Sequence, residues 1–338
     1  MVFNREINTK ISSPARLHIG LHDCGYATDR VFGGVGVIID GVPTTVECAP
    51  SSKVEVNFGE NINPSERTIQ AVDSLLSELE QIFGPVNATV HSMAPEHMGL
   101  GSKTSLLLAL AQSAFMAHGL QFGSNFDEIV KTTGRGGTSG IGVNGFIGGG
   151  LIVDGGHATI GSTRNFSPSS GRLVKEMAPV ISRVAMPSSW RTRLYYDPEF
   201  IPIEGDKEKN LFKNLMPLPA EEIYRSMATT FHSIIPAVLG QDLHALGIGL
   251  REMNSIGMKR REIDLQTQKT RNFLKYLWES QIAAGLSSFG PTIFTVLESG
   301  QSDSEMIHSM AFEYGMDYFG EFEFNNHGAV INHDSTII

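Results

Sequence analysis

A glycine-rich segment, Gly134–Gly145, constrains the fold of this chain more than any other stretch of the sequence. Half of its residues, GRGGTSGIGVNG, are glycine. Each glycine costs backbone entropy in a helix or a central strand, so the segment is predicted to be a loop. Successive amides in such a loop form a concavity that binds anions. Arg135, Thr138 and Ser139 add donors suited to phosphate, and the segment therefore predicts a phosphate-binding loop.

A second glycine-rich segment, Pro95–Ser105, leads directly into a predicted helix. Gly99 and Gly101 let the backbone approach a ligand, and the amides at a helix start attract anions. The segment is not a P-loop, because a serine separates Gly101 from Lys103 and the upstream glycine of that motif is missing. The Rossmann pattern also fails, since Thr104 stands where a third glycine is required. We therefore predict an anion site of another kind at this helix start.

Hydrophobic periodicity divides the rest of the chain into strands and helices. The predicted strands are 15–19, 35–39, 44–48, 53–58, 88–92, 180–185, 192–196 and 292–297. The predicted helices are 63–83, 102–118, 126–133, 220–239, 242–254, 268–284 and 306–314. The composition changes at about residues 165–180, and we place a domain boundary after residue 178.

The composition is that of a globular protein with small ligands. The chain has 338 residues, of which 41% are hydrophobic and 18% charged. It contains no apolar run of about 18 residues or more and no apolar signal segment at its start, so a cytoplasmic protein is expected. Its formal net charge of −10 argues against nucleic acid or membranes as partners. A phosphate ligand must then be met by a few local cations and helix ends.

Several short stretches carry a resemblance to a known family. They are residues 13–21, 33–36, 95–102, 134–145, 149–156 and 287–292, and 134–145 is the most specific of them. Their order and spacing resemble the GHMP kinase superfamily. Within it, the chain looks most like the β-ribofuranosylaminobenzene 5′-phosphate synthase family of tetrahydromethanopterin biosynthesis. The resemblance extends over about residues 11 to 296, nearly the whole chain.

The resemblance implies an α+β, GHMP-kinase-like fold of two domains. Residues 1–178 would form an N-terminal mixed-sheet domain with the phosphate loop, and residues 179–338 a C-terminal ferredoxin-like domain. The active site is expected between them, where clefts commonly form. A homodimer is expected from the family alone.

One departure from the superfamily pattern separates a kinase from a transferase. Kinases with this motif commonly read Ser-Gly-Ile-Asp, and the aspartate is their catalytic base. Here the motif reads Ser139-Gly140-Ile141-Gly142, so that carboxylate is absent. Lys103 also stands where such kinases prefer a small residue. Without the base, phosphoryl transfer to a hydroxyl is harder to support.

The related synthases join ribose C1 of phosphoribosyl pyrophosphate to a ring carbon of an aromatic acid, with loss of carbon dioxide and pyrophosphate. We therefore predict a decarboxylating pentosyltransferase whose partners are phosphoribosyl pyrophosphate and an acid of the 4-aminobenzoate or 4-hydroxybenzoate type. Two alternatives remain open. One keeps the donor and uses a heteroaromatic acid, as in C-nucleoside synthesis, and the other is an ATP-dependent small-molecule kinase.

The resemblance also implies roles for particular residues. One end of the donor would be held, with Mg²⁺ bridging its pyrophosphate, by Gly99, Gly101, Ser102, Lys103 and Thr104. The other end would be held by Arg135, Gly136, Gly137, Thr138 and Ser139, with Gly140 and Asn144 in the same segment. The sequence leaves open which loop takes the pyrophosphate, and the magnesium ligands are unknown.

Apart from His97, which belongs to the Pro95–Ser105 segment, the remaining candidates lie outside the two glycine-rich segments. Arg16 would pair with the aromatic carboxylate, and Asp154 or Asp23 would bind ribose hydroxyls or magnesium. His18 and His97 are further substrate-binding candidates. If 15–19 is a strand, His18 and His22 need not converge, which argues against a transition-metal site.

Overall fold

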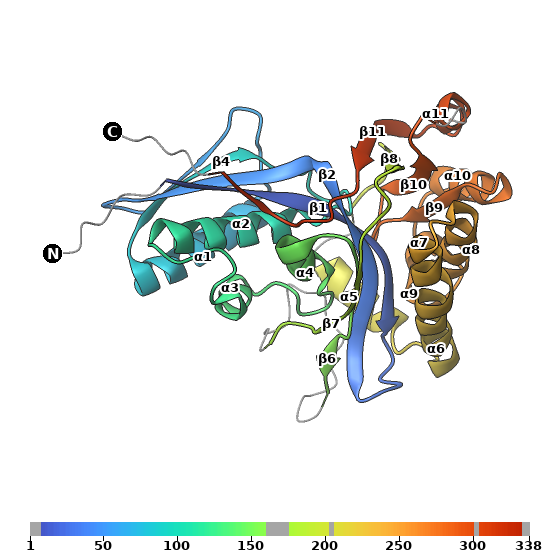
Figure 1. The fold of residues 1–338 in the computed structure, drawn as a ribbon, viewed down its shortest axis with the longest axis horizontal. Coiled ribbons are helices and arrows are strands. Elements are labelled where there is room, and N and C mark those ends of the chain that lie inside the picture. Colours follow the sequence, from blue (N-terminus) through green and yellow to red (C-terminus); the bar gives the residue numbers. More distant parts are fainter. Residues whose placement is uncertain (1–7, 160–175, 203–205, 301–303, 333–338) are drawn as a thin grey trace.

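The computed structural model describes residues 8–159, 176–202, 206–300 and 304–332, which form two sheets with helices packed against them (Figure 1). Within these residues the larger sheet has eight strands and the smaller sheet four. The α+β class expected from the sequence is confirmed.

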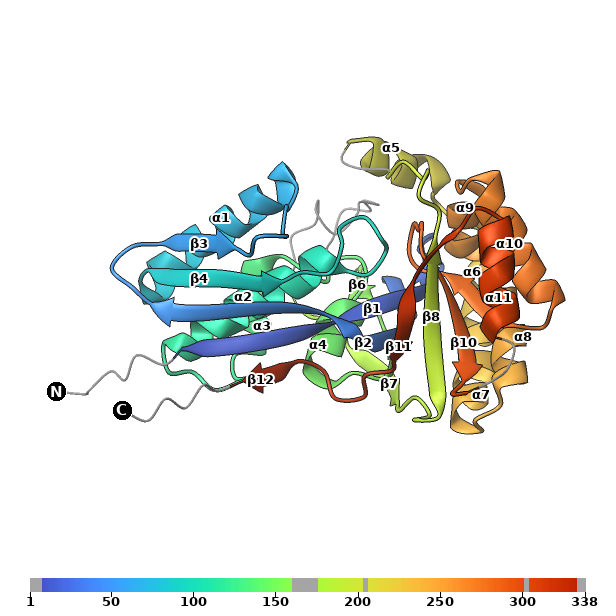
Figure 2. The same ribbon diagram turned by 90° about the horizontal axis from the view of Figure 1, so that it is seen from above.

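A long antiparallel pair of strands, β1 (Thr9–Asp23) and β2 (Arg30–Pro50), forms the spine of the larger sheet. Strands are added on both sides in the order β12-β1-β2-β4-β3, and β5, β6 and β7 extend the far end of the hairpin. The bounds are β3 Glu55–Phe58, β4 Val86–Ser92, β5 Leu151–Asp154, β6 His157–Ala158, β7 Val180–Val184 and β12 Val330–Asn332. Figure 2 shows the β1–β2 hairpin running from the outer end of the molecule to the helices of the smaller sheet.

Four helices cover one face of the larger sheet (Figure 1). They are α1 (Glu66–Phe83), α2 (Ser102–Ala117), α3 (Phe126–Thr133) and α4 (Ile141–Gly148). Nearly every residue of α2 is buried, because α2 lies between the sheet and the other helices. Its apolar face fixes where the glycine-rich segment before it must lie.

The smaller sheet is antiparallel, in the order β11-β8-β10-β9. Its strands are β8 (Trp190–Tyr196), β9 (Ala283–Leu286), β10 (Ile293–Glu298) and β11 (Asp317–Glu323). Its helices are α6 (Ala220–Thr229), a π-helical turn at Thr230–Ile234, α7 (Ile235–Leu239), α8 (Leu243–Asn254), α9 (Gly257–Asp264), α10 (Gln268–Glu279) and α11 (Ser304–Glu313). A further helix, α5 (Asp206–Leu215), lies at the edge of the molecule beside the junction of the two parts (Figure 2). The strand order is the split β-α-β arrangement of ferredoxin-like domains.

Four predicted elements differ from the structure. The helix expected over 220–239 is interrupted by the π-helical turn at Thr230–Ile234. The strands expected at 35–39 and 44–48 are parts of one strand, β2, which bulges around Gly41 opposite Pro14. The helix expected over 268–284 ends at Glu279, and Ala283 and Ala284 instead pair with β10. Burial in the sheet has outweighed the helix propensity of the alanines.

The predicted boundary after residue 178 stays a prediction. Strand pairing shows how the chain runs near it. β7, just beyond this position, pairs with β5 in the larger sheet. β12 returns from the smaller sheet to pair with β1. Part of the C-terminal half of the sequence therefore belongs to the larger sheet.

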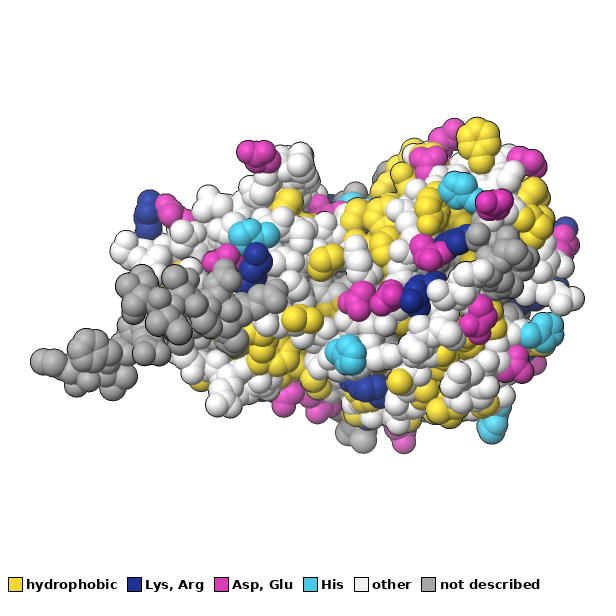
Figure 3. Space-filling model, turned by 45° about the horizontal axis from the view of Figure 1, so that its top comes forward, with side chains coloured by type: hydrophobic (Ala, Val, Ile, Leu, Met, Phe, Trp, Pro, Cys, Tyr) yellow, Lys and Arg dark blue, Asp and Glu magenta, His cyan; other side chains and the backbone are white. Residues whose placement is uncertain are grey.

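The face shown in Figure 3 carries basic and acidic side chains interspersed, with apolar side chains gathered mainly toward the end formed by the smaller sheet. Exposed apolar residues at that end include Phe312, Met306 and Tyr318. None of the helices in the described ranges is long and apolar enough to span a bilayer.

Candidate functional site

The loop before α2 turns repeatedly into the left-handed region of backbone space. His97, Gly99 and Gly101 have φ angles of 59°, 71° and 79°. The helix's first backbone hydrogen bond joins Ser105 N to Gly101 O at 3.0 Å, so the earlier amides point out of the helix end. An amide-lined helix start of this kind favours an anion.

Glu96 fastens this loop to the start of α1. Its carboxylate accepts hydrogen bonds from Ser65 N (2.6 Å) and Ser65 Oγ (3.1 Å), and Thr68 Oγ1 donates to it as well. The side chain thus caps α1 from a distant position in the sequence. The loop is therefore anchored on the side away from the smaller sheet.

The second glycine-rich segment is not a loop throughout, because α4 begins at Ile141. The prediction that its glycines exclude a helix is wrong from that residue onward. A Cβ on Gly145 would lie 2.2 Å from Ile38 Cδ1, and one on Gly142 would lie 3.2 Å from Thr104 Cγ2. The glycines therefore let α4 approach β2 and α2 closely, and this packing outweighs their low helix propensity.

The structure brings the two predicted phosphate loops together at one place. Arg135 Nε donates to Thr104 Oγ1 at 3.1 Å, which joins the second segment to the first turn of α2. Gly142, at the start of α4, faces the methyl group of the same Thr104. Two helix N-termini and one arginine therefore meet around this threonine.

Arg16 on β1 lies between these two helix starts. Its Nη1 donates to Gly99 O at 2.6 Å. Its Cγ lies 3.0 Å from the position a Cβ would take on Gly101, and 3.8 Å from that position on Gly142. Burial lowers the pKa of Arg16 to about 10, while the charge of Glu262 raises this pKa and the charge of Arg135 lowers it. At neutral pH the site thus holds two neighbouring guanidinium cations.

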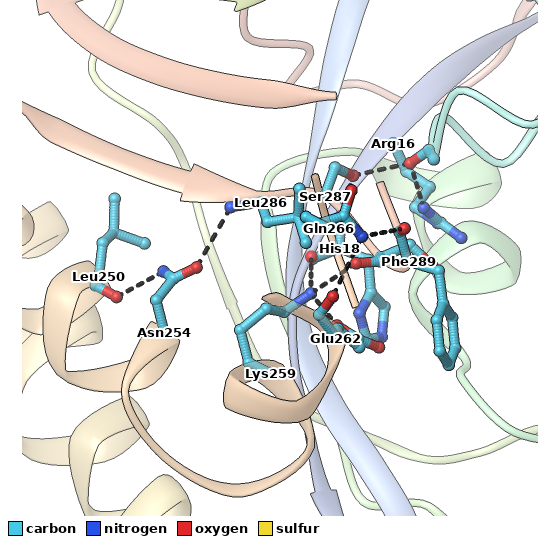
Figure 4. Close-up of polar contacts among 12 residues, drawn as sticks. Arg16, His18, Leu250, Asn254, Lys259, Glu262, Gln266, Leu286, Ser287 and Phe289 are labelled. Atoms are coloured by element: carbon cyan, nitrogen blue, oxygen red, sulfur yellow. Dashed lines mark hydrogen bonds and ion pairs between the residues drawn. The ribbon is translucent and has the colours of Figure 1, made fainter. Parts of the chain in front are cut away.

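The third glycine turn, residues 285–292, also contacts the first loop. Ser287 Oγ donates to Gly99 O at 2.7 Å and accepts from His18 N at 3.0 Å. A Cβ on Gly99 would lie 2.4 Å from Ser287 O, so only glycine fits there. Figure 4 shows Ser287 and Arg16 approaching the same carbonyl. The smaller sheet therefore contributes a turn to the site.

Asp154 and Asn144 hold backbone in place behind the second segment. The Asp154 carboxylate accepts from Gly140 N and Gly156 N, each at 3.0 Å. Burial raises the pKa of the Asp154 carboxyl to about 6, although the hydrogen bonds from the two amides lower this pKa. Asn144 Nδ2 donates to Ala178 O at 3.1 Å. Both side chains are buried, and these hydrogen bonds join them to backbone groups of the fold.

Other predicted residues of the two loops are placed as follows. Gly136 O forms a hydrogen bond with His157 Nε2 at 2.9 Å, and Ser139 Oγ accepts a hydrogen bond from Ile141 N at 3.4 Å. Gly137, Thr138 and Ser102 are buried, whereas His97 is exposed. Lys103 Nζ donates to Arg67 O on α1 at 3.3 Å.

Asp23 and His18, the remaining candidates on β1, differ in their surroundings. The Asp23 carboxylate accepts from the amides of Gly25, Ala27 and Thr28 and so fixes the β1–β2 turn. The His18 ring is buried, and neither ring nitrogen has a hydrogen-bond partner among the residues that the structure describes. Burial and then the charge of Arg16 hold the pKa of His18 well below its usual value, so the ring is neutral.

Within the described parts of the chain, no three His, Cys, Asp or Glu side chains lie close enough together to hold a metal ion. The hydroxyls of Ser102 and Thr104 are oxygen ligands in the first turn of α2. Magnesium usually keeps several waters and binds through substrate phosphates. This donor set therefore fits an ion that arrives with a diphosphate, and it does not fit an ion caged by carboxylates.

Sequence reasoning missed several residues that build the site, among them Ser287, Glu96 and Lys259. Ser287 lies in a stretch, 287–292, that carries the family resemblance, but it was not predicted to be a site residue. Glu96 accepts from the Ser65 amide, and Lys259 Nζ donates to the carbonyls of His18 and Ser288. These partners are far away in the sequence, and no local spacing shows such contacts. The glycine motifs were the signal that located the site.

Comparison with known proteins gives close relatives of one kind. The chain is 32% identical over 296 residues to the β-ribofuranosylphenol 5′-phosphate synthase of Methanocaldococcus jannaschii, covering 84% of this chain and 88% of that protein. It is 33% identical over 294 residues to the protein of the same name from Methanothermobacter thermautotrophicus, covering 85% and 88%. No protein-family model matches the chain.

Among solved structures the chain resembles homoserine kinase from Cytophaga hutchinsonii, with a TM-score of 0.67, 13% identity, and coverage of 96% of this chain and 97% of that one. It also resembles phosphomevalonate kinase from Streptococcus pneumoniae, with a TM-score of 0.64, 14% identity, and coverage of 95% and 99%. At these identities the likeness shows the fold alone, which is that of GHMP kinases.

Proposed function

The chain belongs to the β-ribofuranosylphenol 5′-phosphate synthase family, and from this premise we propose that it is a decarboxylating pentosyltransferase. It joins ribose C1 of phosphoribosyl pyrophosphate to a ring carbon of an aromatic carboxylic acid. Carbon dioxide and pyrophosphate are the other products.

The observation that carries this proposal is the pair of arginines around Gly142. Arg16 and Arg135 lie beside the start of α4. The related kinases carry a catalytic aspartate there, at the position of Gly142. Residue 142 has no side chain, and the nearby Asp154 is occupied by two backbone amides. A site with two cations and no base at this position suits a polyanionic leaving group better than deprotonation of a hydroxyl.

The reaction requires no proton transfer to the protein. The C1–O bond to pyrophosphate breaks, and the leaving group keeps the electron pair. A ring π pair of the acceptor forms the new C1–C bond at the carbon that bears the carboxylate. The C–CO₂ bond then breaks, and its electron pair restores the aromatic ring. Neutralising the leaving group and positioning the two reactants can supply most of the rate.

We place the pyrophosphate where the starts of α2 and α4 meet. The amides of α2, Thr104 and Arg135 surround this place, and the contact between Arg135 and Thr104 makes the two loops parts of one site. The two ends of the donor are then not divided between the two loops. Arg16 faces the same place from β1. We assign its guanidinium to the pyrophosphate, as the second cation beside Arg135, and not to the acceptor carboxylate that the resemblance implied. Magnesium would enter as the complex with the diphosphate.

The acceptor is proposed from the product in the relatives' name, a ribofuranosyl phenol. Loss of carbon dioxide from 4-hydroxybenzoate leaves a phenol, whereas 4-aminobenzoate would leave an aniline. We therefore favour 4-hydroxybenzoate as the acceptor, with 4-aminobenzoate and heteroaromatic acids as alternatives. A place in methanopterin synthesis, a cytoplasmic location and a homodimer belong to the same proposal. An ATP-dependent kinase is less supported, because its base is missing and the relatives are synthases.

The test is release of carbon dioxide from carboxyl-labelled 4-hydroxybenzoate by the purified protein with Mg²⁺, with and without phosphoribosyl pyrophosphate. Release that depends on the donor is expected. Labelled 4-aminobenzoate in a parallel reaction compares the two acceptors. If no aromatic acid releases carbon dioxide while ATP stabilises the protein against heat and the donor does not, the transferase proposal is wrong and the kinase takes its place.

A further inference from the structure

The ammonium group of Lys259, on α9, lies buried beneath the site. Its side chain is 1% exposed, and it forms an ion pair with Glu262, which is 4% exposed, one turn along the same helix. Nζ also donates to His18 O at 3.3 Å and to Ser288 O at 3.1 Å. An ammonium has three protons, and here each has an acceptor. Figure 4 shows the three contacts converging on Nζ.

The two carbonyls that Lys259 binds belong to the two parts of the molecule. His18 lies on β1 of the larger sheet, and Ser288 lies in the glycine turn that precedes β10 of the smaller sheet. Ser288 has a φ of 53°, a left-handed conformation that a residue with a side chain adopts only when its surroundings hold it there. Ser288 N also donates to His18 O at 3.1 Å. The ammonium thus fixes a strained turn against the strand that carries Arg16.

A short chain of hydrogen bonds connects the contact of Lys259 with His18 and Ser288 to the proposed pyrophosphate site. His18 N donates to Ser287 Oγ, and Ser287 Oγ donates to Gly99 O. Gly99 O also accepts from Arg16, two residues from His18 on the same face of β1. A shift of the turn at Ser287 would therefore change both the loop before α2 and the guanidinium beside it.

Charge supports the same arrangement. Glu262 raises the pKa of Arg16, and Arg16 lowers the pKa of Lys259, so the three charges act on one another. Burial is the largest effect on both cations and favours their neutral forms. An apolar pair of equal size would avoid the desolvation of these charges. Hydrophobic side chains, however, could not bind the two carbonyls.

We propose that Lys259, held by Glu262, is a positioning residue that sets the loop before α2 and Arg16 in their donor-binding geometry. This inference rests on the proposed function for its ligand and on the described contacts for its mechanism. Lys259 does not touch the donor in this account. It acts through His18, Ser287 and Gly99.

The first test replaces both charges by neutral groups of similar size, in the variant Lys259→Met with Glu262→Gln. The matched control is Lys275→Met with Glu279→Gln, which removes an exposed ion pair from α10. We expect the KM for phosphoribosyl pyrophosphate to rise about tenfold in the buried-pair variant. The kcat at saturating donor and the KM for the acceptor should change little, and the control should match the wild type. A purely structural role would instead lower the amount of folded enzyme and leave the donor KM unchanged.

The second test needs neither substrate nor activity. Hydrogen exchange in the peptides that contain residues 16–18 and 287–288 should quicken about tenfold in the buried-pair variant and remain unchanged in the control. If the buried-pair variant does not fold, Ser287→Ala takes its place, because it removes only the hydroxyl between His18 and Gly99. A folded variant with wild-type exchange and a donor KM within about twofold of the wild type overturns the inference. A wild-type protein that releases no carbon dioxide would contradict the proposed function instead, and the exchange result would then decide the inference alone.

Discussion

At the scale of single residues, position 142 decides which charges face the ligand. An aspartate there would place a carboxylate beside Thr104 and the stem of Arg16. It would compete with the pyrophosphate for the two arginines. We expect Gly142→Asp to raise the donor KM about tenfold or more and Gly142→Asn, of nearly the same size, to raise it much less. Steady-state kinetics check this, and equal effects of the two variants would show that size, not charge, is what matters at this position.

Arg135 and Lys103 were equal candidates in the sequence, and the structure separates them. Arg135 binds Thr104 where the two helix starts meet, whereas the Lys103 ammonium lies against Arg67 O on α1. Loss of a charged group that faces a desolvated phosphate is more damaging than loss of one at the rim. We expect Arg135→Ala to weaken donor affinity by about tenfold or more and Lys103→Ala by less than about threefold. Titration calorimetry with the magnesium complex of the donor measures both, and the reverse order would contradict the assignment.

The candidate residues that the sequence grouped by type have different surroundings in the structure. The convergence of Arg16, Thr104 and Arg135 follows from motifs that glycine spacing made visible. Asp23 and Asp154 were candidates for binding ribose hydroxyls or magnesium. Each of them binds amides of the turn next to it. A carboxylate that holds a turn and one that holds a ligand have the same sequence signature, so this distinction could not be predicted.

At the scale of secondary-structure elements, the predictions succeeded where packing follows a simple period. The helix predicted over 102–118 is α2, because its apolar residues face both the sheet and the neighbouring helices. No helix was predicted at α9, whose residues are mostly charged. Its buried Lys259 and Glu262 interrupt the apolar pattern on which helix prediction depends. The element that holds the third turn in place was therefore missed.

We expect acid to lower the stability of the protein through the contact between β1 and the π-helical turn after α6. His22 Nε2 lies 2.9 Å from Thr230 Oγ1, and burial lowers the pKa of His22 to about 4. The unfolded chain binds a proton near pH 6.5, whereas the folded protein does not until about pH 4. The contribution of the neutral His22 ring to the free energy of unfolding should therefore be complete above about pH 7. The free energy of unfolding should fall by roughly 3 kcal/mol as the pH drops to about 4.

His22→Gln tests this expectation, since glutamine keeps a partner for Thr230 and does not titrate. Urea unfolding at pH 5 and pH 7.5 should show a smaller loss of stability in the variant than in the wild type. His18 is also buried and neutral, so part of the acid sensitivity should remain in His22→Gln. The same pH dependence in both proteins would contradict the role of His22.

At the scale of the whole molecule, the chain crosses between its two sheets more than once. It leaves the larger sheet after β7 and returns to it from β11 through Phe324 and Asn325 to β12. A site made from β1, α2, α4 and a turn of the smaller sheet needs both parts in a fixed relation. We infer that the two parts unfold together.

Asn325 holds the segment that leads from β11 back to β12, so a substitution there tests whether the two parts unfold together. The side chain is 2% exposed. Its Oδ1 accepts from His327 N and Gly328 N at 2.9 and 2.7 Å, and its Nδ2 donates to Asp40 Oδ1 at 2.7 Å. Asn325→Ala would leave the buried Gly328 amide without its side-chain partner and would remove the contacts to Asp40 and His327. We therefore expect the free energy of unfolding to fall by about 2 to 3 kcal/mol. The exposed neighbour provides the control, His327→Ala, which should change it by less than about 0.5 kcal/mol.

The unfolding transitions of Asn325→Ala also test whether the two parts unfold together. Trp190 and Trp278 both lie in the part built on the smaller sheet, so tryptophan fluorescence follows that part, while far-ultraviolet circular dichroism follows the whole fold. If the two parts are one cooperative unit, both signals will shift together to lower urea concentration in Asn325→Ala. If the fluorescence transition stays at its wild-type position while circular dichroism moves, the parts unfold separately. The relation between the third turn and the loop before α2 would then have to be maintained by local contacts alone, among them the ammonium of Lys259.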